Sequence, residues 1–200
     1  MDLTDTILEQ TFVYRLWQAP FAEQKFAAVL ANNDLERAKR VLDVACGPGT
    51  NTHHFARSEY LGVDVNPRYI RNARKRHGRE FSVADVRTYR PAISERFDFI
   101  LVNSFLHHLD TKDVLEILVH LRSFLTEEGN VHLLELVLPE ERSLARLLAR
   151  WDRGEYARPL SEWQGIFTQV FEPVIFQPYP VGAMGVVLWN MVYFKGRSQK

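Results

Sequence analysis

The sequence has few of the features that mark secreted, nucleic-acid-binding or membrane proteins. It contains one cysteine, Cys46, among 200 residues. No internal disulfide framework can form, and we expect a reducing, cytoplasmic location. Basic and acidic residues number 25 each, so no excess positive charge would attract a nucleic-acid backbone. We therefore expect no nucleic-acid partner.

Long hydrophobic runs are also missing. The first ten residues carry Asp2, Asp5 and Glu9 before any apolar run, which is unlike a secretory signal. The one membrane-like stretch, Val181–Phe194, contains Asn190 and is shorter than the roughly 20 residues that a spanning helix needs. We expect it to belong to the protein core, and we expect no spanning membrane segment.

What the chain does have is an alternation of strand-like and helix-like segments. Hydrophobic residues make up 46% of the chain, enough for one sizeable core. Strands are predicted at Val41–Val44, Tyr60–Val65, Glu80–Val83, Phe97–Asn103, Val131–Leu138, Phe171–Gln177 and Leu188–Phe194. Helices are predicted at Thr50–Ser58, Arg68–His77 after Pro67, Lys112–Leu125 (ended by Gly129), Pro139–Arg153 and Leu160–Phe171, with two more in Thr4–Ala31 separated by Pro20. This order predicts an α/β fold with a Rossmann-like, doubly wound, mostly parallel sheet.

The stretch Val41–Asn51 reads V-L-D-V-A-C-G-P-G-T-N. It predicts a strand, a tight glycine turn and the start of a helix. Gly47 and Gly49 allow backbone conformations that a Cβ would forbid. A ligand could therefore approach bare backbone beside the positive end of a helix dipole. An ordinary strand-to-helix turn would have the same pattern.

Polar residues end the next three predicted strands. Asp64 follows the second strand and can accept hydrogen bonds from both ribose hydroxyls of a nucleoside. Asp85 follows the third and can accept from an exocyclic amine of adenine. Asn103 and Ser104 end the fourth, where backbone carbonyls can receive an ammonium group. Because ligands of such sheets bind beyond the carboxyl ends of the strands, these groups would share one site. A turn aspartate beside Asn66-Pro67 and a plain capping role for Asp85 are the structural alternatives.

Taken in order, these motifs resemble the class I S-adenosylmethionine-dependent methyltransferases, closest to the small-molecule type. The matching residues are V-L-D-V-A-C-G-P-G-T at Val41–Thr50, G-V-D at Gly62–Asp64, A-D at Ala84-Asp85 and F-D-F-I-L-V-N-S-F-L-H-H-L at Phe97–Leu109. The likeness covers roughly Leu42 to Leu138.

The resemblance implies a seven-stranded sheet whose last strand is antiparallel. It also implies that the Ala45–Gly49 loop holds the methionine part of S-adenosyl-L-methionine, that Asp64 holds the ribose, and that Asp85 with Val86 frames the adenine. Asn103 would lie near the reacting centre. The full predicted cofactor-binding set is Asp43, Ala45, Cys46, Gly47, Gly49, Asp64, Val65, Asp85, Val86, Asn103, Ser104, Tyr14 and Arg15. Tyr14 or Arg15 would reach the cofactor carboxylate, as N-terminal helices do in related enzymes.

A nicotinamide-dependent dehydrogenase is the main competitor on fold grounds. Its fingerprint is G-x-G-x-x-G. Here Thr52 stands at the third glycine position, and no Y-x-x-x-K pair is present. The pattern therefore favours S-adenosylmethionine over a dinucleotide.

The predicted function is methyl transfer to a small-molecule acceptor by in-line displacement, for which the protein orients the acceptor and excludes water. The candidate catalytic residues are His107 and His108, since a hydroxyl or carbon acceptor needs a general base. Their structural alternative is a polar link between strand and helix. The alternative function is a non-catalytic or regulatory protein that binds the cofactor. Cys46 is predicted to be a small buried residue and not a nucleophile.

We expect no metal site. His53 and His54 are adjacent, and neighbouring side chains on a helix point about 100° apart, so such a pair rarely ligates one ion.

The acceptor pocket is expected from the segments that flank the motif region. A single domain, residues 1–200, would comprise an N-terminal helical lid or brace (1–38), a cofactor-binding core (40–138) and substrate-side helices with the final strand pair (139–196). Arginines recur at helical spacing at Arg142, Arg146, Arg150 and Arg153; they form either an anion site or a solvated face. Trp151, Tyr156, Arg158 and Trp163 would suit an anionic or aromatic acceptor. The sequence does not specify an oligomeric state.

Overall fold

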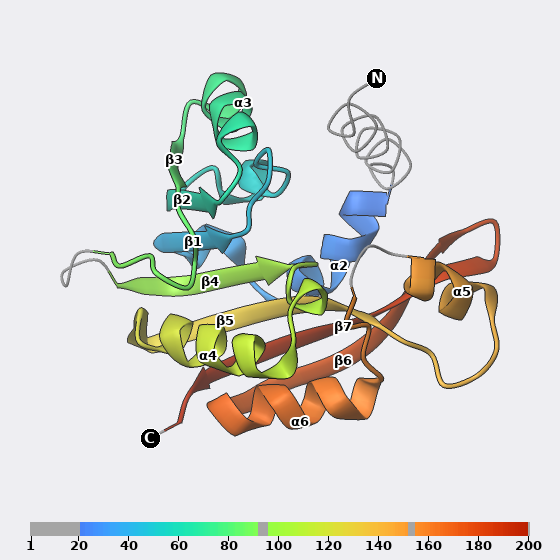
Figure 1. The fold of residues 1–200 in the computed structure, drawn as a ribbon. Helices are drawn as coiled ribbons and strands as arrows, with labels where there is room; N and C mark the ends of the chain where they lie inside the picture. Colours follow the sequence, from blue (N-terminus) through green and yellow to red (C-terminus); the bar gives the residue numbers. More distant parts are fainter. Residues whose placement is uncertain (1–20, 92–95, 152–154, 200) are drawn as a thin grey trace, which may run out of the picture.

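A seven-stranded sheet is the centre of the molecule in the computed structural model, which describes residues 21–91, 96–151 and 155–199 (Figure 1). Its strand order is β3-β2-β1-β4-β5-β7-β6. The strands are β1 (Arg40–Val44), β2 (Glu59–Asp64), β3 (Glu80–Val83), β4 (Phe97–Asn103), β5 (Leu125–Val137), β6 (Phe171–Ala183) and β7 (Val186–Ser198). The mostly parallel Rossmann-like prediction is confirmed.

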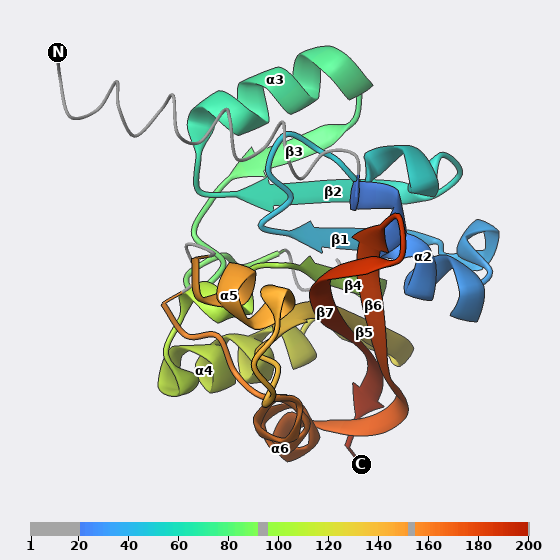
Figure 2. The ribbon, with the colours of Figure 1, turned by 90° about the vertical axis from the view of Figure 1, so that its right-hand side faces the viewer.

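One strand of the sheet, β7, runs opposite to the other six. β3, β2, β1, β4 and β5 pair in parallel, whereas β7 is antiparallel to β5 and to β6. Figure 2 shows β6 and β7 rotated strongly away from β1, β2 and β3, as the twist of a large sheet requires. The chain leaves β1 toward β2 on one side and later returns to β4 on the other. The strand order therefore reverses between β1 and β4, where such sheets bind ligands.

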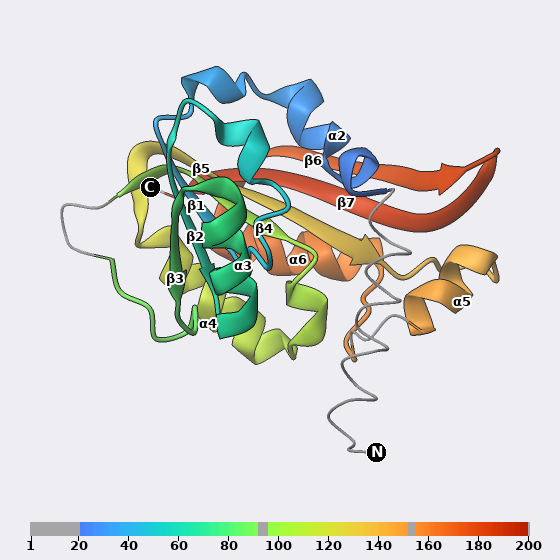
Figure 3. The same ribbon diagram turned by 90° about the horizontal axis from the view of Figure 1, so that it is seen from above.

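Helices cover both faces of the sheet (Figure 3). They are α2 (Ala22–Asn32), α3 (Pro67–His77), α4 (Thr111–Arg122), α5 (Leu144–Trp151) and α6 (Leu160–Val170), with short 3₁₀ turns η2 (Leu35–Arg37), η3 (Thr52–Phe55) and η4 (Leu106–His108). One core cluster joins α4 and α6 to the sheet, and a second joins α2, α3 and η3 to its other face. Because both faces are covered, β1 and β4 are apolar along most of their length.

The predicted helix Arg68–His77 is present as α3, which begins one residue earlier, at Pro67. The side chain of Asn66 accepts a hydrogen bond from the backbone of Arg68 at 2.9 Å, and Pro67 occupies the first turn. Gly78, with φ of 60°, ends α3.

Two predicted helix boundaries are wrong. Thr50–Ser58 contains only the short turn η3, since the chain must reach β2 at Glu59 within a few residues. Gly129 does not end a helix; it lies inside β5, which begins at Leu125. A Cβ on Gly129 would lie 2.8 Å from the carbonyl oxygen of Phe97, so glycine is needed there for close strand approach.

Val181–Phe194 is not one continuous apolar element. It contains the end of β6, the turn at Met184 and Gly185, and most of β7, and several of its turn residues are exposed. Among the helices within the described ranges, none has both the length and the apolarity required to cross a membrane.

Candidate active site

The loop after β1 adopts a backbone that few side chains tolerate. Ala45, Gly47 and Gly49 all have positive φ, at 54°, 57° and 79°. The N–H of Cys46 donates to the carbonyl of Val63 at 3.1 Å and anchors the loop to β2. Cys46 is buried, and burial raises the pKa of its thiol far above the ordinary value. This environment disfavours a thiolate nucleophile, in accord with the sequence prediction.

Asp64 ties this loop to the end of β2. Its Oδ2 accepts a hydrogen bond from the N–H of Gly47 at 2.8 Å, and its Oδ1 accepts one from the N–H of Asn66, also at 2.8 Å. The residue is 9% exposed. Each carboxylate oxygen accepts one described hydrogen bond and has capacity for another. Asp64 can therefore organise the loop and still accept from a ligand hydroxyl.

Asp43 lies beneath the loop and not on its surface. It is 1% exposed, and the hydroxyl of Tyr60 donates to its Oδ2 at 2.7 Å. Among the described residues, its buried Oδ1 has no hydrogen bond of ordinary geometry, although the side chain of Asn51 lies close enough to lower the pKa of the carboxyl group. Burial raises the pKa of Asp43 to about 7, against the lowering effect of the Tyr60 hydrogen bond. An unsatisfied buried oxygen under a glycine loop is a typical feature of a functional site.

Asp85 is held by its neighbour Arg87. The backbone N–H of Arg87 donates to Oδ1 at 2.9 Å, and its guanidinium Nε donates to both oxygens at 3.0 Å. Hydrogen bonding from Arg87 lowers the pKa of Asp85. A ligand amine would have to share this carboxylate with the guanidinium. The adjacent Val86 is buried in the core, whereas Val65 is 69% exposed after β2.

The end of β4 meets the β1 loop through two asparagines. The Nδ2 of Asn103 lies 3.4 Å from the Oδ1 of Asn51, which is itself buried. Ser104 has a φ of 55°, and its hydroxyl donates to Oδ1 of Asn103 at 3.1 Å. The first, second and fourth strands thus present linked polar groups at one edge of the sheet.

The two candidate catalytic histidines lie in different environments. His107 is 3% exposed, and its Nδ1 lies 2.7 Å from Oε2 of the fully buried Glu135. The other oxygen of Glu135 accepts from the N–H groups of Phe105 and Leu106 at 2.9 and 2.7 Å. Glu135 therefore fixes the turn after β4, and His107 belongs to that fixed structure. His108 is exposed.

Arg158 and Trp163 do not form an open acceptor surface. Arg158 is buried and donates to the carbonyls of Leu109 and Tyr156 at 2.8 and 3.1 Å. Its guanidinium lies 4.8 Å from the ring centroid of the fully buried Trp163. Arg158 braces the segment after α5 against the turn at η4, and the indole N–H of Trp163 donates to the carbonyl of Leu136 in β5 at 2.9 Å. The prediction that Arg158 and Trp163 face an acceptor is wrong, because the guanidinium of Arg158 donates to backbone carbonyls and the ring of Trp163 packs in the core.

The predicted arginine face is described only in part. Arg146 donates to the carbonyl of Pro139 and to that of Glu140. Tyr14, Arg15 and Arg153 lie outside the described residues, as does the side chain of Trp151.

Sequence reasoning missed Glu135 and Asn51. Glu135 stands in the apolar run V-H-L-L-E-L-V-L of β5. A lone acidic residue in a strand covered on both faces indicates a buried, paired carboxylate, but the sequence pattern does not identify its partner. Asn51 ends the glycine motif and has no local signal of its own.

The comparisons with known proteins agree with this geometry. Residues 41–129 match the family model described as a methyltransferase domain. This segment is therefore similar to methyltransferase domains. The chain is 34% identical over 115 residues to trans-aconitate 2-methyltransferase of Escherichia fergusonii, covering 54% of this chain and 44% of that protein. The chain thus spans less than half the length of the curated relatives that it matches.

Solved structures of methyltransferases share the fold of this chain at low sequence identity. The N-methyltransferase NodS of Bradyrhizobium japonicum WM9, in complex with S-adenosyl-L-homocysteine, has a TM-score of 0.70 and 17% identity, covering 92% of this chain and 88% of that one. The dimethyltransferase RosA of Streptomyces davawensis has a TM-score of 0.73 and 19% identity, covering 99% and 60% of the two chains.

Proposed function

We propose that the protein transfers a methyl group from S-adenosyl-L-methionine to a small-molecule acceptor by in-line displacement. One observation carries this proposal. The left-handed loop after β1, the carboxylate of Asp64, the carboxylate of Asp85 and the amide of Asn103 lie at the carboxyl ends of four adjacent strands. Together they offer groups for the amino acid, ribose and base parts of one nucleoside ligand.

The residues present fit that cofactor. When bound, S-adenosylmethionine supplies a methyl group on a sulfonium that already contains its leaving group. The free lone pairs of Asp64 would accept from the ribose hydroxyls, and the exposed backbone near Gly47 would contact the methionine part. Asp43 is buried beside this loop and would support it from below, without contacting the cofactor. Asp85 would receive the adenine amine beside Arg87.

A small carboxylic acid is the acceptor class that we propose to test first. The matched relatives are named for trans-aconitate methylation. A carboxylate is already deprotonated near neutral pH, so its oxygen can attack without a general base. A carboxylate acceptor would therefore not need His107 as a base, in agreement with the contact that holds the His107 ring against the buried Glu135. If the acceptor is instead a hydroxyl, the exposed His108 is the better candidate base.

Cofactor binding can be tested with a matched pair of variants. Asp98, at the other edge of the sheet, also accepts two backbone N–H groups, from Lys39 and Arg40 at 2.9 and 2.7 Å. Asp64→Asn and Asp98→Asn therefore remove the same kind of backbone contact. By calorimetry, Asp64→Asn should weaken binding of S-adenosylmethionine and S-adenosylhomocysteine about 10- to 150-fold, because charge-assisted hydrogen bonds are lost.

Asp98→Asn should leave both affinities unchanged. Equal affinities in wild type and Asp64→Asn would contradict the assigned role of Asp64. Turnover is then measured on a panel of di- and tricarboxylic acids, phenols and amines by detecting the demethylated product. Tight cofactor binding without turnover on any acceptor would favour the non-catalytic alternative. No binding of either nucleoside would overturn the proposed function altogether.

A further inference from the structure

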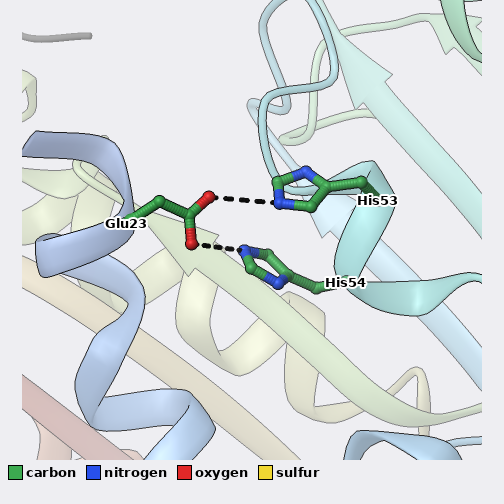
Figure 4. Close-up of side chains that lie close together, drawn as sticks. All are labelled: Glu23, His53 and His54. Carbon is green, nitrogen blue, oxygen red and sulfur yellow. Dashed lines mark hydrogen bonds and ion pairs between the residues drawn. The ribbon is translucent and has the colours of Figure 1, made fainter. Parts of the chain in front are cut away.

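Three side chains that could bind a metal converge beside the loop that follows β1. Glu23 lies in the first turn of α2, and His53 and His54 form the middle of η3. Nε2 of His53 is 3.1 Å from Oε1 of Glu23, and Nε2 of His54 is 3.7 Å from Oε2 (Figure 4). One donor atom from each residue lies within 4.8 Å of the others.

The convergence has a structural cause that the sequence does not contain. His54 is stacked on Phe26 of α2, with ring centroids 4.3 Å apart and planes at 11°. This contact places its ring beside Glu23, one turn earlier on the same helix. The ring of His53 lies 3.9 Å from that of His54, centroid to centroid. The expectation that these adjacent side chains point away from each other is therefore wrong. Each oxygen of Glu23, which comes from another helix, faces one of the two ring nitrogens.

We propose that Glu23, His53 and His54 bind a divalent transition-metal ion of the Zn²⁺ class. Two imidazole nitrogens and one carboxylate oxygen suit Zn²⁺, Co²⁺ or Ni²⁺, whereas Mg²⁺ and Ca²⁺ prefer oxygen ligands alone. Ligands about 2.0–2.1 Å from a tetrahedral ion are about 3.3 Å from one another. The separations of 3.1 and 3.7 Å, which run to the two different oxygens of Glu23, are close to that distance; one donor atom from each residue lies within 4.8 Å of the others, so a small movement of the exposed side chains would complete the site.

Exposure and charge are also suitable. The side chain of His53 is 54% exposed and that of Glu23 is 64% exposed, so an ion can enter from solvent. The side chain of His54 is 11% exposed, which limits its motion. One carboxylate with two neutral imidazoles carries a net negative charge. Three protein ligands leave a fourth position for water or an anion.

A bound ion would join α2 to the turn that directly follows the Ala45–Asn51 loop. Because it would bind the folded state, it would raise the free energy of unfolding by RT ln(1 + c/Kd), where c is the free ion concentration and Kd is its dissociation constant. This site does not depend on the proposed methyl transfer, since no cofactor is needed to fill it. Failure of either proposal therefore leaves the other intact.

The test uses the untagged chain after treatment with a chelator, in a phosphate-free buffer. Zn²⁺ is titrated by calorimetry, and Co²⁺ by its visible absorption, which reports coordination geometry. We expect one ion per chain and a rise in Tm on adding Zn²⁺. Glu23→Gln and His53→Gln should each weaken Zn²⁺ binding on the order of 100-fold, since changes outside the ligand shell alone cost 10–100-fold.

Two substitutions outside the cluster serve as matched controls. Glu36→Gln alters an exposed carboxylate paired with Arg57, and His120→Gln alters a histidine near Tyr89. Both should bind Zn²⁺ like the wild type. His54→Gln is avoided because that ring packs on Phe26. The proposal is overturned if the wild type binds no stoichiometric Zn²⁺, or if Glu23→Gln and His53→Gln bind it as tightly as their controls. Either result would leave an ordinary pairing of histidines with a carboxylate.

Discussion

The parallel strands begin at one edge of the sheet, the amino edge, and end at the opposite one, the carboxyl edge. Polar side chains have different environments at these two edges. At the amino edge, Asp98 accepts two backbone N–H groups. Further along β5, in the middle of the sheet, Nδ1 of His132 lies 2.9 Å from the hydroxyl of Tyr193. The same hydroxyl accepts from Asn33 at 2.8 Å. A cavity of about 670 Å³ opens at the amino edge, lined by Arg40, Lys195 and neighbouring residues.

At the carboxyl edge, strained backbone and an unsatisfied carboxylate oxygen occur together. Ala45 and Ser104 are two of the three non-glycine residues with positive φ in the described ranges. Below the same loop, the buried Oδ1 of Asp43 has no hydrogen bond of ordinary geometry to the described residues. Backbone strain and unpaired buried oxygens lower the stability of the folded state, and they are retained where ligand binding or catalysis requires that geometry. Backbone geometry and the buried carboxylate therefore point to the carboxyl edge as the functional one, although a cavity opens at the amino edge.

Removing Glu135 should produce the largest loss of stability at the carboxyl edge. Its carboxylate accepts from two backbone N–H groups and contacts His107, all in buried surroundings. Glu135→Ala should lower the free energy of unfolding by about 3–5 kcal/mol. Asp98→Ala, at the partly exposed amino edge, should cost only about 1 kcal/mol. Denaturant unfolding measures both, and equal losses would remove the contrast between the edges.

Asp43 should make the stability depend on pH. Its folded pKa of about 7 exceeds its ordinary value of 3.8. Between these values the folded protein binds the proton more tightly than the unfolded chain. The free energy of unfolding should therefore fall as pH rises from about 4 to about 7, by at most about 4 kcal/mol from this group.

Asp43→Asn should abolish that part of the slope, while Asp98→Asn should keep it. The comparison requires denaturant unfolding at several pH values. A wild-type slope that persists in Asp43→Asn would show that another group causes it.

Two glycine-to-alanine substitutions, one at each edge of the sheet, should give smaller differences in the free energy of unfolding. Gly49 in the carboxyl-edge loop has φ of +79°, and a Cβ there would lie 2.8 Å from Oγ1 of Thr52 and 3.0 Å from a ring carbon of His77. Gly78, before β3 at the amino edge, has φ of +60° with no atom within 4 Å of the added carbon. Gly49→Ala should cost about 2–3 kcal/mol, and Gly78→Ala about 1 kcal/mol.

Thermal or denaturant unfolding of the two alanine variants measures these costs. Gly49→Ala should also weaken S-adenosylmethionine binding, whereas Gly78→Ala should not. A larger stability loss in Gly78→Ala would indicate that the close contacts around Gly49 relax without cost.

Local pattern predicted most elements of the fold. The bounds of β3 and β4 agree with the predicted ones, and α3 begins at the expected Pro67. These elements are predictable because their signals are short-range: apolar runs, a proline in the first turn and a terminal glycine. The start of β5 was missed because Leu125 pairs with Phe97, a distant residue in sequence.

The sequence by itself determined the α/β class, the glycine loop and the placement of Asp64, Asp85 and Asn103 at strand ends, since each depends on residues close together in the chain. Tertiary structure alone decided that Asp43 lies beneath the loop, that Glu135 holds His107, and that Arg158 is enclosed by carbonyl groups. It also brought Glu23 to His53 and His54, contrary to the expected divergence of neighbouring side chains. The physical reason is the same in each case. Burial and pairing depend on which distant elements pack together, and no local pattern contains that information.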